Sequence, residues 1–461
     1  MEQDIHTAFN LLKEQNQGLV EETVVLKETV TVLEKSNAKL IEENNQLKEK
    51  LGLNSTNSSL PPSRDLYKIK KQKDRRKSDR KPGGQPGHPG RTYQPLSPDQ
   101  TIDCISEQCI CGSSQVEKTE QFFEEQKIEI PPIKPQVTNY RRWKVKCKAC
   151  QQTTFSPLPD EVQTDLLGPH AKAIIGALNG FYHNSKRDVQ AILSQIFNLD
   201  ISLGLVATTA KRVNVGLEAH YEALKGKNKQ SDYLHIDETG HKNKGKRGWS
   251  WVFTNHTTSL IHLASSRGQK VLSDVLGEYR GNVISDRYGA YNYFSQDQRQ
   301  LFWSHLLRDF KRFSESLQVD LSHKGHRLVT IAREIFALVA NSKKLQISKK
   351  VLYRRLKKLS KEMQWLLKSI TKIPDRPQAQ RVGRNLLKSF RMMWRFVEKP
   401  FIDMTNNLAE RQLRKYVTYR KKLLFTWSDW GEEYVERMLS MFLTCRLNKT
   451  NPFLQLTQFM A

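Results

Sequence analysis

Long apolar runs are absent from this sequence. No stretch approaches the roughly 18 consecutive apolar residues that span a bilayer, so we expect no membrane association. The first residues, MEQDIHTAFN, lack the charged and apolar regions of a secretory signal, and we therefore expect a cytoplasmic protein. Cysteine is scarce, with 6 in 461 residues. Thiols stay reduced in the cytoplasm, which favours metal binding over disulfides.

Acidic residues are outnumbered. The chain has 75 Lys and Arg residues against 48 Asp and Glu, a formal net charge of +27. A surplus of this size favours DNA as a partner, because contacts with phosphates would give salt-sensitive affinity. Hydrophobic residues make up only 38% of the chain. From the length we expect about two to four units rather than one compact core.

Leucine recurs every seven residues near the N-terminus, at Leu12, Leu19, Leu26, Leu33, Leu40 and Leu47. A seven-residue apolar stripe stays buried only when two helices supercoil, so residues 5–53 are predicted to form an α-helical coiled coil. Asparagines at the facing seam positions Asn16, Asn37 and Asn44 favour a two-stranded, in-register pair. We therefore expect a homodimer. The alternative is a single amphipathic helix packed on the body of the protein.

Residues 54–99 have the composition of a linker. NSTNSSLPPS (54–63) and GGQPGHPG (83–90) are rich in turn-forming residues. Between them lies a dense basic run that includes Lys70, Lys71, Arg75 and Arg76. We interpret this run as an arm that follows the DNA backbone. A solvated tether is the alternative.

Five of the six cysteines lie within residues 100–157, which we predict to be a small zinc-binding domain. Cys147 and Cys150 have the usual two-residue spacing, whereas one residue separates Cys109 from Cys111. Two such pairs can hold one structural Zn²⁺ through four thiolates, which leave no open position for water. Cys104 is the alternative to Cys109 as a ligand. The alternating stretch 127–146 between the pairs predicts short strands.

The remaining sequence contains a helical region followed by a region with both strand and helix patterns. Residues 160–230 are predicted to be helical, and RDVQAILSQIF, NLDIS and LGLVATTAKRV resemble a helix-turn-helix. This region is a candidate for DNA binding, although two packed helices with a polar turn would give the same pattern. Strand-like and helical segments then predict a mixed α/β core. We assign 231–304 and 401–430 to this core, 305–400 to a helical insertion and 431–461 to a C-terminal helical element.

Three acidic residues in this core are candidate metal ligands. Asp237 in LHIDETG lies on a predicted strand, and Asp286 in NVISDRYGAY ends a second strand. Glu410 in TNNLAERQLR lies where a helix begins. Acids at the ends of strands in one sheet can converge with a third acid on a helix. Two divalent ions held this way would activate an attacking oxygen and stabilise a leaving oxygen in phosphodiester cleavage.

Basic residues surround these acids, as suits a site that also holds phosphate. Arg287 follows one of the aspartates, and Arg411 and Arg414 follow the glutamate. We predict that all three contact DNA. His305 in FWSHLLRDF is a secondary candidate, with a buried core histidine as the alternative. Glu238 would point to the opposite face of its strand from the adjacent aspartate, so we set it aside.

These segments resemble transposases of the insertion sequence 66 family. The matching stretches are NSSLPPS with GGQPGHPG, CICG, CKAC, LHIDETG, ISDRYGAYN, FWSHLLRDF and TNNLAERQLR followed by RKKLLFTWSDWGEE. They occur in this order over nearly the whole chain. The resemblance implies a ribonuclease-H-like catalytic core of the DDE type, in which Asp237, Asp286 and Glu410 are the catalytic acids. It also implies dependence on two Mg²⁺ or Mn²⁺ ions.

The expected function is therefore that of a bacterial, nucleoid-associated DNA transposase. The resemblance implies cleavage at the ends of an element, where terminal inverted repeats lie, and joining of the 3′ hydroxyls to target DNA. It also implies that helper proteins of the same element can be partners. Two alternatives stay open. One is a zinc and coiled-coil DNA-binding regulator without catalysis, and the other is a ribonuclease-H-like nuclease that cuts without joining.

Overall fold

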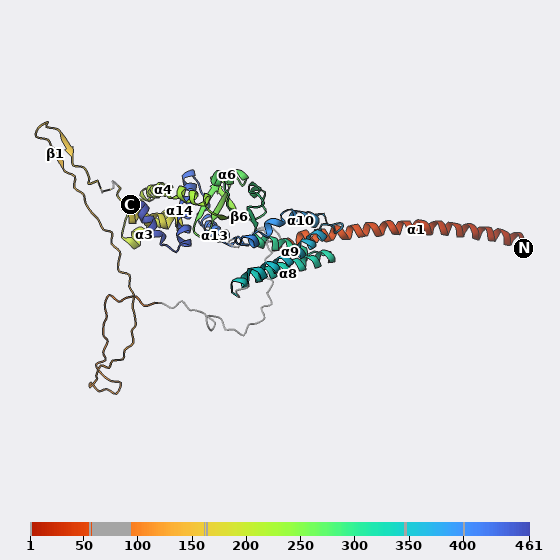
Figure 1. The fold of residues 1–461 in the computed structure, drawn as a ribbon, viewed down its shortest axis with the longest axis horizontal. Helices are drawn as coiled ribbons and strands as arrows, with labels where there is room; N and C mark the ends of the chain where they lie inside the picture. The colour runs from red at the N-terminus through yellow and green to blue at the C-terminus, as the bar shows by residue number, and fades with distance from the viewer. Residues whose placement is uncertain are drawn as a thin grey trace. The chain divides into compact units, whose positions relative to one another are not determined.

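The computed structural model describes residues 2–54, 57, 94–160, 162, 165–344, 348–399 and 402–461. These residues divide into two compact units. The larger contains the described parts of Met1–Tyr67, Pro159–Val189 and Ser202–Ala461, and the smaller those of Lys68–Leu158 and Gln190–Ile201 (Figure 1). The basic residues predicted to follow DNA, Lys70, Lys71, Arg75 and Arg76, lie outside the described residues.

A five-stranded mixed sheet lies at the centre of the larger unit. Strands β3 (Tyr233–Asn243), β4 (Lys246–Thr254) and β5 (Ser259–Ala264) form an antiparallel meander. Strand β6 (Asn282–Ser285) pairs in parallel with β3, and β7 (Arg299–Leu301) pairs in parallel with β6. The resulting strand order is β5-β4-β3-β6-β7. The predicted mixed α/β core is confirmed.

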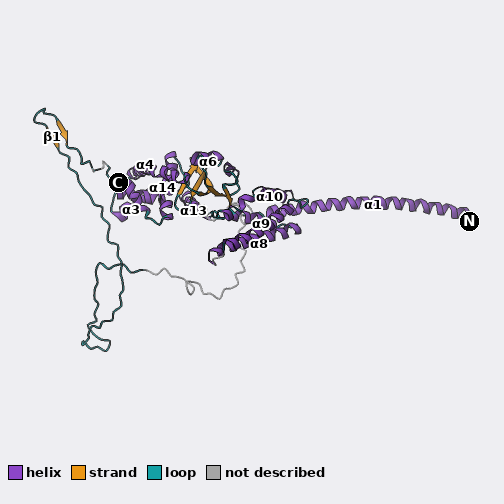
Figure 2. Ribbon diagram, viewed as in Figure 1, coloured by secondary structure: helices purple, strands orange, loops and turns teal. Residues whose placement is uncertain are grey.

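Helices cover both faces of this sheet, as Figure 2 shows in purple around the orange strands. Because successive side chains alternate between faces, Trp251 and Phe253 of β4 pack with α6 (Gln269–Leu276), while Val252 packs with helices from the carboxyl end of the chain. Burial on both faces explains why β4 reads as a continuous run of apolar residues near its end.

Helix α14 (Asp429–Leu447) protects the edge of the sheet formed by β5. Ser440 Oγ accepts a hydrogen bond from the backbone N–H of Ile261 (2.8 Å), and Thr444 Oγ1 accepts one from Ser259 (3.1 Å). An edge strand otherwise presents a row of unpaired N–H groups. Helix α14 is therefore part of the core, although the predicted boundary at residue 430 placed it in a separate C-terminal element.

Residues 160–230 were predicted to be helical, and the structure has helices there. These helices precede the strands of the sheet in the chain, and helix α15 follows α14. Their bounds are α2 (Pro169–Gly176), the π-helix η2 (Ala177–Phe181), α3 (Lys186–Phe197), α4 (Leu203–Gly216), α5 (Glu218–Lys229) and, at the end, α15 (Pro452–Met460). The two segments of the predicted helix-turn-helix correspond to α3 and α4. Their use in DNA binding stays a prediction.

The predicted insertion is helical and has its own apolar core, which includes Trp303, Phe310, Leu328 and Met363. Between β6 and this insertion the chain forms the short 3₁₀ helix η3 (Gly289–Tyr293) and the edge strand β7. The helices are α7 (Trp303–Ser314), α8 (Val319–Lys344), α9 (Lys349–Ile370), α10 (Pro377–Lys388), α11 (Phe390–Met393) and α12 (Arg395–Glu398). The chain then returns to the sheet with α13 (Asn407–Lys422).

The predicted N-terminal helix is present as α1 (Glu2–Leu51). Its heptad leucines are exposed in the single chain, with Leu26 at 63% and Leu33 at 62%. None of the described helices is long and apolar enough to cross a membrane. The helix is thus confirmed, while its pairing in a coiled coil stays a prediction.

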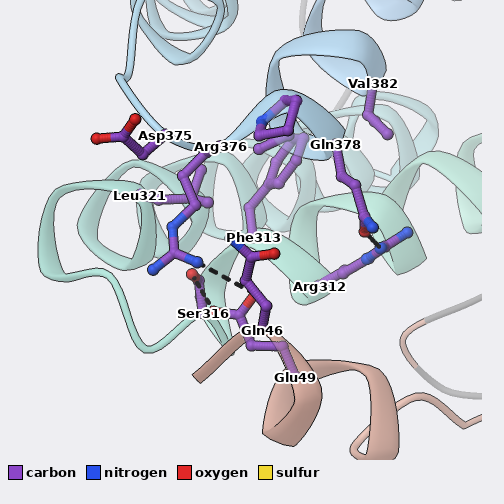
Figure 3. A pocket seen from close by; sticks show the side chains of 12 residues that line it. Gln46, Glu49, Arg312, Phe313, Ser316, Leu321, Asp375, Arg376, Gln378 and Val382 are labelled. Atoms are coloured by element: carbon purple, nitrogen blue, oxygen red, sulfur yellow. Dashed lines mark hydrogen bonds and ion pairs between the residues drawn. The ribbon is translucent and has the colours of Figure 1, made fainter. Parts of the chain in front are cut away.

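The last turns of α1 contact the helical insertion. Arg376 Nη1 lies 2.8 Å from Glu42 Oε1, and the Ser316 hydroxyl donates to Glu49 Oε1 (2.7 Å). Figure 3 shows Glu49 and Gln46 of α1 beside Ser316 and Arg376 of the insertion. Arg376 is buried, whereas its partner Glu42 is partly exposed. These contacts attach the end of the leucine helix to the insertion.

The described part of the smaller unit holds two short strands and, within Gln190–Ile201, most of helix α3. Its strands are β1 (Lys144–Lys146) and β2 (Thr153–Phe155), which form an antiparallel pair. The prediction of several strands in 127–146 is wrong except for β1, because 94–143 has no helix or strand. Pro131, Pro132 and Pro135 explain the difference. Proline has no N–H to donate to a strand ladder and is confined to strand edges.

Candidate active site

The first two candidate acids lie on neighbouring parallel strands. Asp237 is in β3, and Asp286 directly follows β6. In the parallel pair, His235 lies opposite Ile284. Asp237 and Asp286 each lie two residues beyond this last pair, at the same end of the two neighbouring strands. The sheet therefore brings together two residues that are far apart in the sequence.

Asn406 attaches the start of α13 to β3, next to Asp237. Its side-chain Nδ2 donates to the carbonyl oxygen of Ile236 (2.9 Å), and its Oδ1 accepts from Nδ1 of His235 (3.1 Å). The Asn406 side chain is 1% exposed. The backbone N–H of Glu410 in turn donates to the carbonyl oxygen of Asn406 (3.1 Å). The third acid thus lies one helical turn after the residue that contacts the strand of the first.

The three acids interact electrostatically. Burial raises the pKa of Asp237 well above its ordinary value, and the negative charges of Glu238, Asp286 and Glu410 raise it further. A hydrogen bond from the backbone N–H of Glu238 opposes this shift. Like charges that share a site have this effect on the pKa. The side chains of Asp237, Asp286 and Glu410 are half-buried.

Glu238 has other partners. Its Oε1 accepts hydrogen bonds from Arg267 (2.8 Å from Nε), and its Oε2 accepts one from the Tyr291 hydroxyl. Arg267 also stacks over the ring of Tyr288, 3.7 Å from its centre. Both oxygens of Glu238 are therefore engaged in a buried network, although its charge still acts on Asp237.

The donor set fits hard divalent cations, because Mg²⁺ and Mn²⁺ prefer carboxylate oxygens and retain several waters. Mutual repulsion among the acids would be relieved by a cation between them. Within the described residues, however, no three Asp, Glu, His or Cys side chains lie close enough to hold one ion together. The acids are close enough for their charges to interact, but their oxygens are too far apart to bind one ion together.

The comparison with known protein families decides the assignment. A model described as the transposase IS66 family matches residues 184–434, more than half of the 461 residues. The chain belongs to the IS66 transposase family. The match includes β3, β6 and α13, and the mixed α/β core is consistent with a DDE transposase domain.

Two further similarities were found for this transposase. A family described only as being of unknown function (DUF6444) matches residues 9–94, which include most of α1 and the basic run. An uncharacterized protein of Sinorhizobium fredii (strain NBRC 101917 / NGR234), y4hP, is 23% identical over 400 residues. That alignment covers 79% of this chain and 71% of y4hP.

Two residues that the sequence did not single out fix the loop after β6 and the start of α13. Arg299 Nη2 donates to the carbonyl oxygen of Asp286 (3.0 Å), and its Nη1 donates to Asn292 (3.0 Å). Asn406 has the role described above. Asn406 lies within the family-like stretch TNNLAERQLR, which was a usable signal. Arg299 is one of 75 basic residues, and nothing in the sequence distinguished it.

The predicted DNA-contacting residues of the transposase core differ in their surroundings. Arg411 and Arg414 are exposed on α13, whereas Arg287 is half-buried and pairs with Asp309. His305 lies at the start of α7. Burial and the charges of Arg308 and Arg287 together lower its pKa to about 4, against the opposing charge of Asp286. His305 is therefore neutral at pH 7 and acts as a neutral group near the acids.

Each predicted cysteine pair lies in a tight backbone turn. The N–H of Cys109 donates to the carbonyl oxygen four residues later (2.9 Å), and that of Cys147 donates to the carbonyl oxygen five residues later (2.8 Å). In both turns the residue after the second cysteine has a left-handed backbone, with φ of 86° at Gly112 and 61° at Gln151. The two turns thus have a similar local shape.

The thiols interact within each pair. Hydrogen bonds from Cys111 lower the pKa of Cys109, and hydrogen bonds from Cys150 lower that of Cys147. A lowered pKa favours the thiolate form that binds zinc. All of these thiols and Cys104 are exposed. As placed, the two pairs do not form one four-ligand site among the described residues.

Asn406→Ala is expected to lower the free energy of unfolding of the catalytic core by about 1–3 kcal/mol, because it leaves the buried carbonyl of Ile236 and the ring of His235 without this partner. Urea unfolding of the full chain, followed by tryptophan fluorescence, measures the change. Asn407→Ala is the control, because the adjacent Asn407 is exposed. Equal effects of the two substitutions would refute the anchoring role of Asn406.

Proposed function

We propose that this transposase cleaves the ends of an insertion sequence and joins the 3′ hydroxyls to target DNA, using Asp237, Asp286 and Glu410 on a ribonuclease-H-like core. The observation that carries the proposal is that the charges of Asp286 and Glu410 both act on Asp237, although the three residues span 174 positions of sequence (410 − 237 + 1). An antiparallel three-strand meander extended by two parallel strands supports the fold assignment.

In this proposal the three carboxylates hold two Mg²⁺ or Mn²⁺ ions. When bound, such ions activate the nucleophile as Lewis acids and stabilise the leaving oxygen. The protein contributes the position of each acid. β3 and β6 fix the two aspartates, Arg299 holds the backbone at Asp286, and Asn406 holds the helix that carries Glu410. Exposed arginines on α13 neutralise phosphates of the bound DNA.

Cleavage and joining are the same kind of reaction. In cleavage, the oxygen of water bonds to phosphorus, the bond from phosphorus to the 3′ oxygen of the element breaks, and that oxygen takes up a proton. In joining, the new 3′ hydroxyl bonds to a target phosphorus and loses its proton, and the target strand releases its own 3′ oxygen, which takes up a proton. Because both are in-line substitutions at phosphorus, one set of carboxylates serves both steps. No covalent enzyme intermediate is required.

Asp237→Asn, Asp286→Asn and Glu410→Gln are each expected to lower cleavage and joining by at least about 100-fold, a typical loss when one group that stabilises the transition state is removed. Binding of DNA should persist, because the basic surface is unchanged. The assay uses full-length protein, labelled element ends and a plasmid target with Mg²⁺ or Mn²⁺. Asp274→Asn is the matched control, since Asp274 is exposed on α6.

The same assay separates the alternatives. A DNA-binding regulator would retain its full activity in Asp237→Asn and yield no cut DNA in any variant. A nuclease that does not join would cut the labelled ends but never transfer them to the plasmid. Cut and joined products from the wild type, both lost together in the three acid variants, are the outcome that the proposal requires.

We also propose that Cys109, Cys111, Cys147 and Cys150 hold one structural Zn²⁺. The proposal is supported by the two similar turns and by the lowered pKa of one thiol in each pair. Metal analysis of the purified full chain is expected to find one Zn²⁺ per chain, which Cys147→Ser loses. Cys104→Ser should keep the metal. Loss of zinc in Cys104→Ser but not in Cys109→Ser would make Cys104 the ligand instead.

We propose further that α1 pairs two copies of the transposase, so that two DNA ends are held together. Its support is the exposed leucine seam. The double substitution of Leu26 and Leu33 by Lys is expected to turn the dimer into a monomer in sedimentation velocity, because charge would enter the seam. The matched double substitution of Val25 and Val32 by Lys should leave the dimer intact. These valines are equally exposed but lie outside the seam. Helper proteins stay an expectation from the family.

A further inference from the structure

A groove of about 460 Å³ lies where α13 ends and α14 begins. Its lining combines aromatic rings with basic side chains from the start of α3. The groove is lined among others by Tyr419, Phe425, Trp427, Trp430, Lys186 and Arg187. Trp427 is 70% exposed, which is unusual for so large an apolar side chain. We call this site the aromatic groove.

Positive charge is concentrated on one ring of the aromatic groove. The ammonium group of Lys186 lies 5.0 Å from the centre of the Trp430 ring, and that of Lys211 lies 5.6 Å from it. Burial lowers the pKa of Lys186, and the charge of Lys211 lowers it further. Two cations that repel each other beside one ring favour an anion between them, and aromatic faces attract flat or cationic groups.

The wall that carries Trp427 is held in a fixed conformation. Leu424 and Phe425 have left-handed backbones, with φ of 54° and 74°. Non-glycine residues adopt this region at a cost and keep it only where their surroundings enforce it. Here the N–H of Lys244 donates to the carbonyl oxygen of Thr426 (3.0 Å), and the N–H of Thr426 donates to that of Lys242 (3.3 Å). The β3–β4 hairpin therefore pre-forms the aromatic wall.

Helix α13 connects the candidate acids with the aromatic groove. Glu410 lies near its start, and Leu423, which lines the groove, follows its end. At 1.5 Å per residue the two are about 20 Å apart along the helix axis. Arg411, Arg414 and Lys421 are exposed and, at spacings of three and seven residues, share one face of the helix. A DNA strand from the acids can follow this basic face for about six nucleotides, at 3.4 Å per base pair.

We propose that the aromatic groove binds an unpaired base of the DNA, stacked on Trp427, with the adjoining phosphate held by Lys186 and Lys211 beside Trp430. The inference rests on the proposed function, because the DNA that reaches the acids supplies the base. Stacking on aromatic rings beside a basic track is how proteins bind single strands without regard to sequence. Charge complementarity selects this occupant over an apolar protein segment, which would leave the paired cations without an anion.

The first test measures affinity of the full-length protein, in chelator, for a fluorescently labelled 20-nucleotide single strand of mixed sequence and for the same strand in a duplex. Trp427→Ala is expected to weaken binding of the single strand by about 5- to 100-fold and to change duplex binding by less than about two-fold. Trp365→Ala is the matched control, since Trp365 is 64% exposed on α9, away from the groove. It should change neither affinity.

The second test uses the wild type and so does not depend on the folding of a variant. A single strand that contains 5-iodouracil is crosslinked to the full-length protein by light, and the attached peptides are identified by mass spectrometry. Crosslinks are expected within residues 419–434. Unchanged single-strand affinity in Trp427→Ala, or crosslinks only at residues that do not line the aromatic groove, would overturn the inference and leave the groove to a protein segment.

Neither test involves cleavage, so the two proposals can fail separately. Suppose that the wild type joins DNA ends but that Trp427→Ala binds the single strand as tightly as the wild type. This result would refute the aromatic groove alone. A protein that neither cuts nor joins, but loses single-strand affinity in Trp427→Ala and crosslinks within 419–434, refutes the catalytic proposal alone.

Discussion

The hydrogen bonds between Asn406 and β3 are the constraint on which the rest of the catalytic core depends. Parallel pairing of β3 with β6 places two acids side by side, but the third arrives on a helix after an insertion with its own apolar core. The contact at the start of α13 fixes the end of the helix that carries Glu410, while Arg420 near the other end donates to Thr239 (2.9 Å) on the same strand. Asn406 provides the first of these contacts at the residue before Asp237, and Glu410 follows one turn later.

Periodicity in the sequence was sufficient to predict the main elements. The strands that carry Asp237 and Asp286, the helix that begins near Glu410, the long N-terminal helix and the helical insertion were all predicted, because alternation and heptad spacing are local properties. Contacts between distant segments were not. The roles of Asn406 and Arg299, and the protection of β5 by α14, arise only when the chain is folded. In 127–146, alternation misled because prolines cannot join a strand ladder.

Helix α13 connects two proposed sites of the transposase, the acids near its start and the aromatic groove at its end. Its first turns carry Glu410, its exposed face carries Arg411 and Arg414, and its last turn leads into the aromatic groove. The β3–β4 hairpin contributes to both ends, since β3 carries Asp237 and the hairpin turn fixes the wall at Thr426. In our account, the three acids, the exposed arginines of α13 and the aromatic groove therefore keep a constant spacing. The contacts between α1 and the insertion lie in the same unit.

The most direct measurement of whether the acids share a site is thermal unfolding of the wild type and Asp237→Asn over a pH series, in chelator and with Mn²⁺. Burial and like charges raise the pKa of Asp237 in the folded protein above its ordinary value of 3.8. Without metal, the wild type should therefore lose stability relative to Asp237→Asn as the pH rises from that value through the raised pKa. Mn²⁺ should stabilise the wild type at neutral pH and leave Asp237→Asn nearly unchanged. Equal unfolding temperatures at every pH, with the same response to Mn²⁺ in both proteins, would contradict the convergence of the three acids.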